Sequence, residues 1–140
     1  MSWEDRVRAG FAAQGLMRDW GAEVVSLAPG EVVLAAPITG KVTQHHGFAH
    51  AAVSFALGDN AAGFAALSLM PAGREVLTVE MKINLLAPAQ GVRLLAVGRV
   101  ERAGRRLTVT RSEVFAEDAE GARTAVALML GTMTGVEAAG

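Results

Sequence analysis

Residues 49–69 read AHAAVSFALGDNAAGFAALSL, and this run decides the fold. It is long enough to cross a bilayer, but Asp59 stands near its middle, where a carboxylate in hydrocarbon is costly. The alternative is a helix inside a globular protein, which is apolar on every side when other elements surround it. Many of its positions are Ala or Gly, so its neighbours can approach closely. The run therefore predicts a helix enclosed by a curled sheet and ended by the Pro and Gly of residues 71–73.

Short β-branched runs lie on both sides of this helix in the sequence. The apolar residues of 77–85 stand at every second position, which is the period of a half-buried strand. Short turns between the last three runs predict an antiparallel meander. We therefore expect one α+β domain over residues 1–140, an antiparallel sheet of five or six strands wrapped around one long helix. The expected strands are 22–27, 31–37, 77–85, 92–102, 107–115 and 122–134, with an amphipathic helix in 1–17 and a frayed tail at 135–140.

Composition excludes several classes of protein. The chain has 140 residues, 51% of them hydrophobic, and its 13 Lys and Arg against 14 Asp and Glu give a net charge of −1. This balance argues against non-specific binding of nucleic acid, which needs surplus positive charge. The absence of cysteine excludes disulfides and a thiol nucleophile. Acidic residues at positions 4 and 5 do not suit a signal peptide, so we expect a cytoplasmic protein with no membrane partner.

A motif whose residues could take part in catalysis spans residues 44–61, around the start of the central helix. It resembles the signature of the PaaI-type hotdog thioesterases, in which a His-Gly-Gly at the helix start precedes an Asp. On this resemblance His50 is the motif histidine, Asp59 the catalytic carboxylate and Gln44 the upstream amide. The two motif glycines are replaced by Ala51 and Ala52, which keeps the Ala51 N–H but narrows the space above it.

The resemblance extends over residues 24–134, and Thr78 matches a Ser or Thr that lies near the active site in this family. It implies the hotdog fold and the hydrolysis of an acyl-CoA thioester to a free acid and CoA. Coenzyme A would enter only as part of the substrate, with no cofactor and no metal.

Helix geometry indicates that one chain does not complete this site. His50 and Asp59 are nine residues apart, so they point to opposite faces of the helix and lie about 13 Å apart along it. A two-fold dimer would bring Asp59 of one subunit to the helix start of the other and form two equal sites. We therefore expect a homodimer, and the resemblance implies a homotetramer.

Hydrolysis of a thioester needs an attacking group and a donor for the oxyanion that forms. The first N–H groups of a helix have no internal partner, so the Ala51 N–H is the predicted oxyanion donor. Asp59 can act as a base on water or as the nucleophile itself, and the sequence leaves both open.

Substrate contacts are expected in two further places. Four arginines at positions 99, 102, 105 and 106 gather around one turn. We predict that Arg102, Arg105 and Arg106 bind the phosphates of CoA, since guanidinium groups form paired hydrogen bonds with phosphate. A solvated turn is the alternative. The expected acyl pocket contains Phe48, Phe55 and Met81, which are equally suited to the core.

Other functions fit the sequence less well. A non-catalytic module that binds or senses acyl-CoA would keep the pocket and the arginines without needing Asp59. A metal site at His45, His46 and His50 would lack cysteine ligands. Ser54 has neither the elbow motif nor a spaced acid–base partner that a serine hydrolase needs. A hotdog hydratase would have a histidine five residues after its Asp, where this chain has Phe64.

Overall fold

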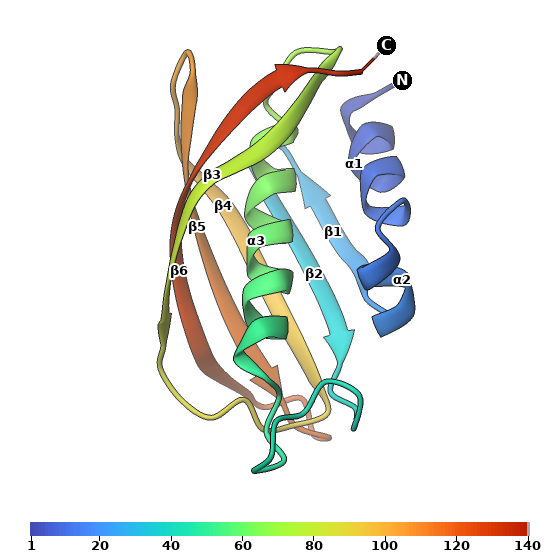
Figure 1. Ribbon diagram of the computed structural model, residues 1–140, viewed down its shortest axis with the longest axis vertical. Helices are drawn as coiled ribbons and strands as arrows, with labels where there is room; N and C mark the ends of the chain where they lie inside the picture. Colours follow the sequence, from blue (N-terminus) through green and yellow to red (C-terminus); the bar gives the residue numbers. More distant parts are fainter. Residues whose placement is uncertain (140) are drawn as a thin grey trace.

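A single six-stranded antiparallel sheet curls around one long helix in the computed structural model, which describes residues 1–139 (Figure 1). The strand order is β1-β2-β4-β5-β6-β3, so β3 and β1 are the edge strands. The predicted α+β architecture is confirmed. In chain order the elements are α1 (Trp3–Ala12), α2 (Gly15–Trp20), β1 (Glu23–Ala28), β2 (Glu31–Pro37), α3 (Ala51–Leu67), β3 (Arg74–Leu85), β4 (Arg93–Ala103), β5 (Leu107–Glu117) and β6 (Arg123–Glu137).

The prediction of one helix within residues 1–17 is wrong, because the segment forms α1 and α2 with a break between them. On one continuous helix Trp20 would point about 140° away from the buried Val7. The break turns the chain so that Met17 and Trp20 are also buried, and the Trp20 indole donates a hydrogen bond of 2.8 Å to the Pro37 carbonyl. Gly21 then ends α2 in the left-handed conformation, with φ 83°.

The expectation that the tail at 135–140 is frayed is also wrong for residues 135–137, which belong to β6 and pair with β3. Strand β3 begins at Arg74, three residues before the predicted start, and so supplies the partners: Arg74 pairs with Glu137. Residue 140 lies outside the described part of the chain. Residues 135–137 are therefore ordered because β3 is long enough to pair with them.

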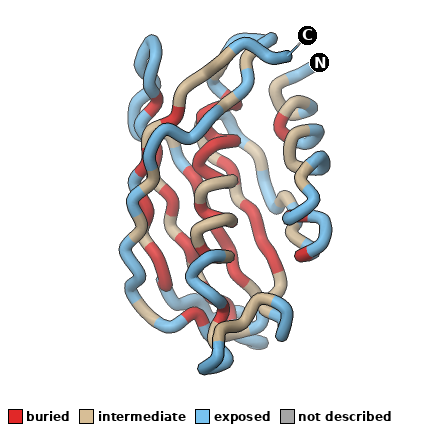
Figure 2. Tube along the Cα trace, in the orientation of Figure 1, coloured by how far each residue is buried: buried red, intermediate tan, exposed pale blue. Residues whose placement is uncertain are grey.

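Helix α3 packs on the concave face of the sheet at very close range. A Cβ at Gly98 on β4 would lie 2.2 Å from the Ala61 carbonyl carbon, so only glycine allows strand and helix to approach this far. The last turns of α3 are enclosed, whereas its first turn is more open (Figure 2). The helix spans Ala51–Leu67 rather than the predicted 49–69, because Ala49 forms a bridge with Thr43 instead. No helix in residues 1–139 has the length and apolar character to span a membrane.

A bulge divides strand β3 and reverses which of its side chains face the helix. The pairing with β6 shifts between Thr78 and Glu80. Beyond the bulge Met81 and Ile83 pack on the core, as the alternating pattern indicates. Leu77 before the bulge and Val79, the extra residue of the bulge, are exposed, by 54% and 58%. Thr78 therefore points inward.

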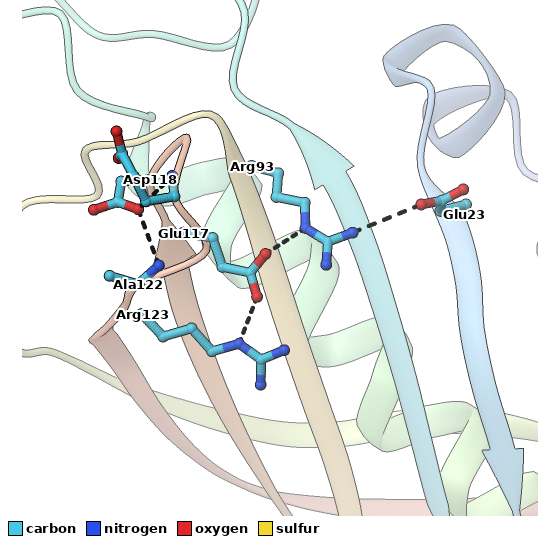
Figure 3. A network of polar contacts seen from close by, with 7 residues as sticks. Glu23, Arg93, Glu117, Asp118, Ala122 and Arg123 are labelled. Carbon is cyan, nitrogen blue, oxygen red and sulfur yellow. Dashed lines mark hydrogen bonds and ion pairs between the residues drawn. The ribbon is translucent and has the colours of Figure 1, made fainter.

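A buried carboxylate holds together the end of the sheet at which β5 finishes and β4 and β6 begin. Glu117 at the end of β5 is 6% exposed and accepts hydrogen bonds from Arg93 on β4 and Arg123 on β6 (Figure 3). The Arg93 guanidinium also lies near Glu23 on β1, with 3.9 Å between Arg93 Nη1 and Glu23 Oε1. The hydrogen bonds from the two arginines lower the pKa of Glu117, and the one from Arg93 has the larger effect. The carboxylate therefore stays ionised.

Candidate active site

The start of α3 is fixed by the loop before it. His50 is the N-cap residue, and its Nδ1 accepts a hydrogen bond of 2.9 Å from the Ala52 N–H. The Gln44 Oε1 accepts from the His46 and Phe48 N–H groups at 2.6 and 3.2 Å, which holds the loop in its turn. The Ala51 N–H meets no acceptor anywhere in residues 1–139. It is therefore available to a ligand.

A cavity of about 550 Å³ opens in front of this helix start. Gln44, His50 and Ala51 form its polar side, and Phe48 and Leu86 contribute to its apolar side. This volume falls within the range of small-molecule sites. The cavity thus offers an unpaired N–H at a positive helix end beside an apolar chamber.

Asp59 lies two turns further along α3, and its hydrogen-bond partner is on the edge strand β3. The Thr78 hydroxyl donates a hydrogen bond of 2.7 Å to Asp59 Oδ1. Burial raises the pKa of the Asp59 carboxyl above its ordinary value, and the Thr78 hydrogen bond partly offsets this. A carboxyl group with a raised pKa is a stronger base once ionised, which suits proton transfer from water.

Asp59 and Thr78 line a different cavity, of about 300 Å³, together with Gln14 and Asn60. This cavity shares no lining residue with the one at the helix start. Within one chain the structure therefore brings Asp59 to Thr78, and Gln44 to His50 and Ala51, but it keeps the two groups apart.

The four arginines have three different surroundings. Arg99 forms ion pairs with Glu31 and Glu113, at 2.8 and 3.4 Å, so the strand network already occupies it. Arg105 and Arg106 line a third cavity, of about 370 Å³, next to the end of α3. Arg102 is exposed and does not line this cavity.

The three residues of the expected acyl pocket do not share one cavity. Phe48 lines the cavity at the helix start. Phe55 and Met81 instead pack against the main core cluster and are partly buried there. Both therefore contribute to the core, which is the alternative that the sequence left open.

The histidines do not gather into a metal site. The His45 and His46 ring centroids lie 4.0 Å apart with their planes tilted by 43°, while His50 Nδ1 accepts the hydrogen bond of the helix cap. Within residues 1–139, no three His, Asp or Glu side chains come close enough to hold a metal ion.

Several lining residues escape detection from the sequence. Gln14 donates a hydrogen bond of 2.7 Å from Nε2 to Asn60 Oδ1 beside Asp59, but it comes from the break between α1 and α2, far away in the sequence. Arg74 and Thr108 join Arg105 and Arg106 through the sheet pairing. For Asn60, its place next to Asp59 was a usable signal. For the others no local pattern exists.

A family model described as the thioesterase superfamily matches residues 46–123, which is more than half of the chain. The chain belongs to the thioesterase superfamily. The matched range includes the helix start, Asp59 and Thr78. The class of chemistry of this thioesterase is therefore the hydrolysis of thioesters.

Individual relatives agree with this membership. A 1,4-dihydroxy-2-naphthoyl-CoA hydrolase of Listeria monocytogenes is 29% identical over 103 residues, covering 74% of this thioesterase and 84% of the relative. The crystal structure of a thioesterase family protein from Silicibacter pomeroyi superposes with a TM-score of 0.94 at 39% identity, covering 98% of this chain and all of that one.

The Escherichia coli PaaI protein of the phenylacetic acid degradation operon has the same fold. It superposes with a TM-score of 0.83 at 21% identity, over 99% of this thioesterase and 94% of that chain. The sheet wrapped around α3 is thus a hotdog fold, and the predicted family resemblance is confirmed.

Proposed function

We propose that this thioesterase hydrolyses acyl-CoA thioesters in a site built by two copies of the chain. The observation that carries the proposal is the unpaired Ala51 N–H, which faces a substrate-sized cavity at the start of a long helix. The Listeria relative is named as the hydrolase of a CoA thioester, which supports CoA as the leaving group.

In the reaction the thioester carbonyl oxygen accepts a hydrogen bond from the Ala51 N–H, which stabilises the negative charge that develops there. Asp59 of the second subunit either takes a proton from the attacking water or attacks the carbonyl carbon itself. On the first route, water adds to the carbonyl carbon, the carbon–sulfur bond breaks, and the proton that Asp59 took from the water passes to the thiolate of CoA. On the second route, the carbon–sulfur bond breaks as an acyl-aspartyl anhydride forms. Water then hydrolyses the anhydride, which releases the free acid, restores the Asp59 carboxylate and supplies the proton for the thiolate. Thr78, His50 and Gln44 act as positioning residues for these two groups.

The edge strand β3 supports a dimer of this kind. It has 12 residues, and no strand within residues 1–139 pairs with its outer side. Three of its apolar residues, Leu77, Val79 and Leu85, are at least half exposed. An open, apolar edge of this length favours pairing with a second copy. Such pairing would place the second subunit next to Thr78 and Asp59.

Further apolar residues support the association of two dimers. Leu107 and Val109 of β5 and Leu130 of β6 are exposed by 42% to 51%. They lie on neighbouring strands, and Leu77 joins them through the row Leu107–Thr134–Leu77. A contiguous apolar area of this kind marks an interaction surface. We therefore propose a homotetramer as the final assembly.

The third cavity suits the nucleotide part of CoA. Arg105 and Arg106 share it with Arg74 and with the buried hydroxyl of Thr108. None of these three guanidinium groups forms an ion pair within residues 1–139, so each can meet a phosphate. Arg102 lies on the same hairpin and contributes charge at longer range.

The test is hydrolysis of a panel of acyl-CoAs, followed with a reagent for the free thiol. We expect turnover by the wild type and a loss of at least about 10²-fold in kcat for Asp59→Asn, the usual scale for a general base. Asp118→Asn, whose carboxyl only closes a surface turn, is the matched control. Binding of acyl-CoAs without turnover of any of them would favour the alternative, a non-catalytic acyl-CoA binding module.

A further inference from the structure

Ser54 carries a buried hydroxyl group for which the fold provides no partner. The residue is 2% exposed, yet its hydroxyl forms no hydrogen bond with any group in residues 1–139. The other buried serines behave differently: Ser68 donates to the Ala65 carbonyl at 2.6 Å, and Ser112 donates to the Gly58 carbonyl at 2.7 Å. A buried hydroxyl without a partner is costly, so this one calls for a ligand.

The Ser54 hydroxyl still reaches the solvent of the cavity at the helix start. Ser54 lines that cavity, and among the described residues the only fully enclosed side-chain polar atom without a partner is Arg6 Nε. The hydroxyl is thus neither satisfied by protein nor sealed inside it. Water or a ligand in the cavity is the partner that the structure offers.

Ser54 and Ala51 lie on the same face of α3, because residues three apart in a helix are neighbours. The rise between them is about 4.5 Å. Side chains of a helix lean toward its N-terminus, which brings the Ser54 hydroxyl nearer to the first turn. A group bonded to the Ala51 N–H is therefore within a few atoms of one bonded to Ser54.

We propose that Ser54 determines acyl-group specificity, and that its hydroxyl hydrogen-bonds an oxygen carried by the acyl group at or near the β-carbon. The proposal rests on the proposed function, since it takes this cavity as the acyl site. The thioester oxygen occupies the Ala51 N–H, and the β-substituent lies one helical turn deeper. The remaining walls, such as Phe48, Leu86 and Val126, are apolar and suit the hydrocarbon part of the acyl group.

The experiment compares hexanoyl-CoA with 3-hydroxyhexanoyl-CoA, which differ only by the β-oxygen. We expect the wild type to have the higher kcat/KM for the hydroxylated substrate, and Ser54→Ala to lower the ratio of the two values about two- to tenfold, the range of one neutral hydrogen bond. Both substrates are measured on the same preparation, so a smaller folded fraction cancels from the ratio. Ser112→Ala, which removes a buried hydroxyl that the protein itself satisfies, should leave the ratio unchanged.

The outcomes separate the two proposals. If the wild type hydrolyses both substrates but does not prefer the hydroxylated one, or if Ser54→Ala keeps the ratio, the role of Ser54 is refuted while acyl-CoA hydrolysis stands. If the wild type hydrolyses no acyl-CoA, the proposed function fails instead. Calorimetric affinities for the same pair then decide on Ser54: a preference for the hydroxylated compound that Ser54→Ala removes supports its role, and equal affinities refute it.

Discussion

The Thr78 hydroxyl donates a 2.7 Å hydrogen bond to Asp59 and so joins the edge strand of the sheet to the middle of the central helix. The bond exists because the bulge after Thr78 turns this side chain inward, while Leu77 and Val79 on either side of it are exposed. Two opposing effects then act on the carboxyl group. Burial raises its pKa, and the Thr78 hydrogen bond, which favours the charged form, lowers it again by a smaller amount.

This balance predicts the pH dependence of activity. In the proposed reaction hydrolysis needs the Asp59 carboxylate, so kcat/KM should fall on the acid side around a pKa above the ordinary 3.8 of an aspartate. Thr78→Val removes the bond that lowers the pKa and should move the acid limb to higher pH, whereas Thr78→Ser should keep it in place. A pH–rate profile of the three proteins measures this. An acid limb that Thr78→Val leaves unmoved would show that the hydroxyl does not set this pKa.

A mixed dimer tests whether two chains share each site. In a dimer of Asp59→Asn with Ala51→Pro, one site receives both defects and the other keeps an intact Asp59 and an intact N–H. Proline is tolerated at Ala51, because this is the first residue of α3 and His50 before it has ψ 139°.

The separately tagged, co-expressed heterodimer should therefore recover about half of the normal activity, although each parent homodimer is nearly inactive. The two parents mixed after purification, without subunit exchange, are the control. A folded heterodimer without recovery would mean that each site belongs to a single chain.

The arginine-lined cavity predicts a difference between two substrates. Arg105→Ala with Arg106→Ala should raise KM for an acyl-CoA by about tenfold or more, since each lost hydrogen bond to a phosphate contributes about 1.5–3 kcal/mol. The same acyl group on pantetheine, which lacks the nucleotide phosphates, should keep its KM. Arg111→Ala, on β5 outside this cavity, is the control. Equal losses on both substrates would refute phosphate binding by these residues.

Glu117, which lines neither cavity of the site, predicts a loss of stability. Glu117→Ala removes the acceptor of two arginine hydrogen bonds and should lower the free energy of unfolding by about 1–3 kcal/mol at neutral pH. Because the folded protein lowers the pKa of this group, its contribution is present above the ordinary value of 4.5 and is lost as the pH falls through the folded value. Urea unfolding at neutral and acidic pH measures both effects.

Glu101→Ala, at an exposed position without an ion pair among the described residues, is the control for Glu117. The difference in the free energy of unfolding between wild type and Glu117→Ala should become smaller at acidic pH. A gap that stays constant with pH would show that packing, rather than charge, accounts for the loss.

Periodic patterns predicted the strands and the central helix in their order along the chain, because alternation and apolar runs are local properties of the sequence. The break after Ala12 and the bulge after Thr78 were not predicted, because each depends on a contact with a residue far away in the sequence. Trp20 hydrogen-bonds Pro37, and Thr78 hydrogen-bonds Asp59. The motif placed Asp59 and Ala51 on the correct helix, whereas Gln14 and Arg74 reach their cavities only through tertiary packing.

Contact between Gly98 and the Ala61 backbone sets how deep α3 lies against the sheet. Asp59 is two residues before this contact, so the height of its carboxyl group above β4 depends in part on main-chain atoms. Substitutions of core side chains leave this main-chain contact in place, so they can accumulate over evolutionary time without removing it. Position 98 lacks this freedom, because any side chain there would displace the helix together with the groups that we assign to catalysis.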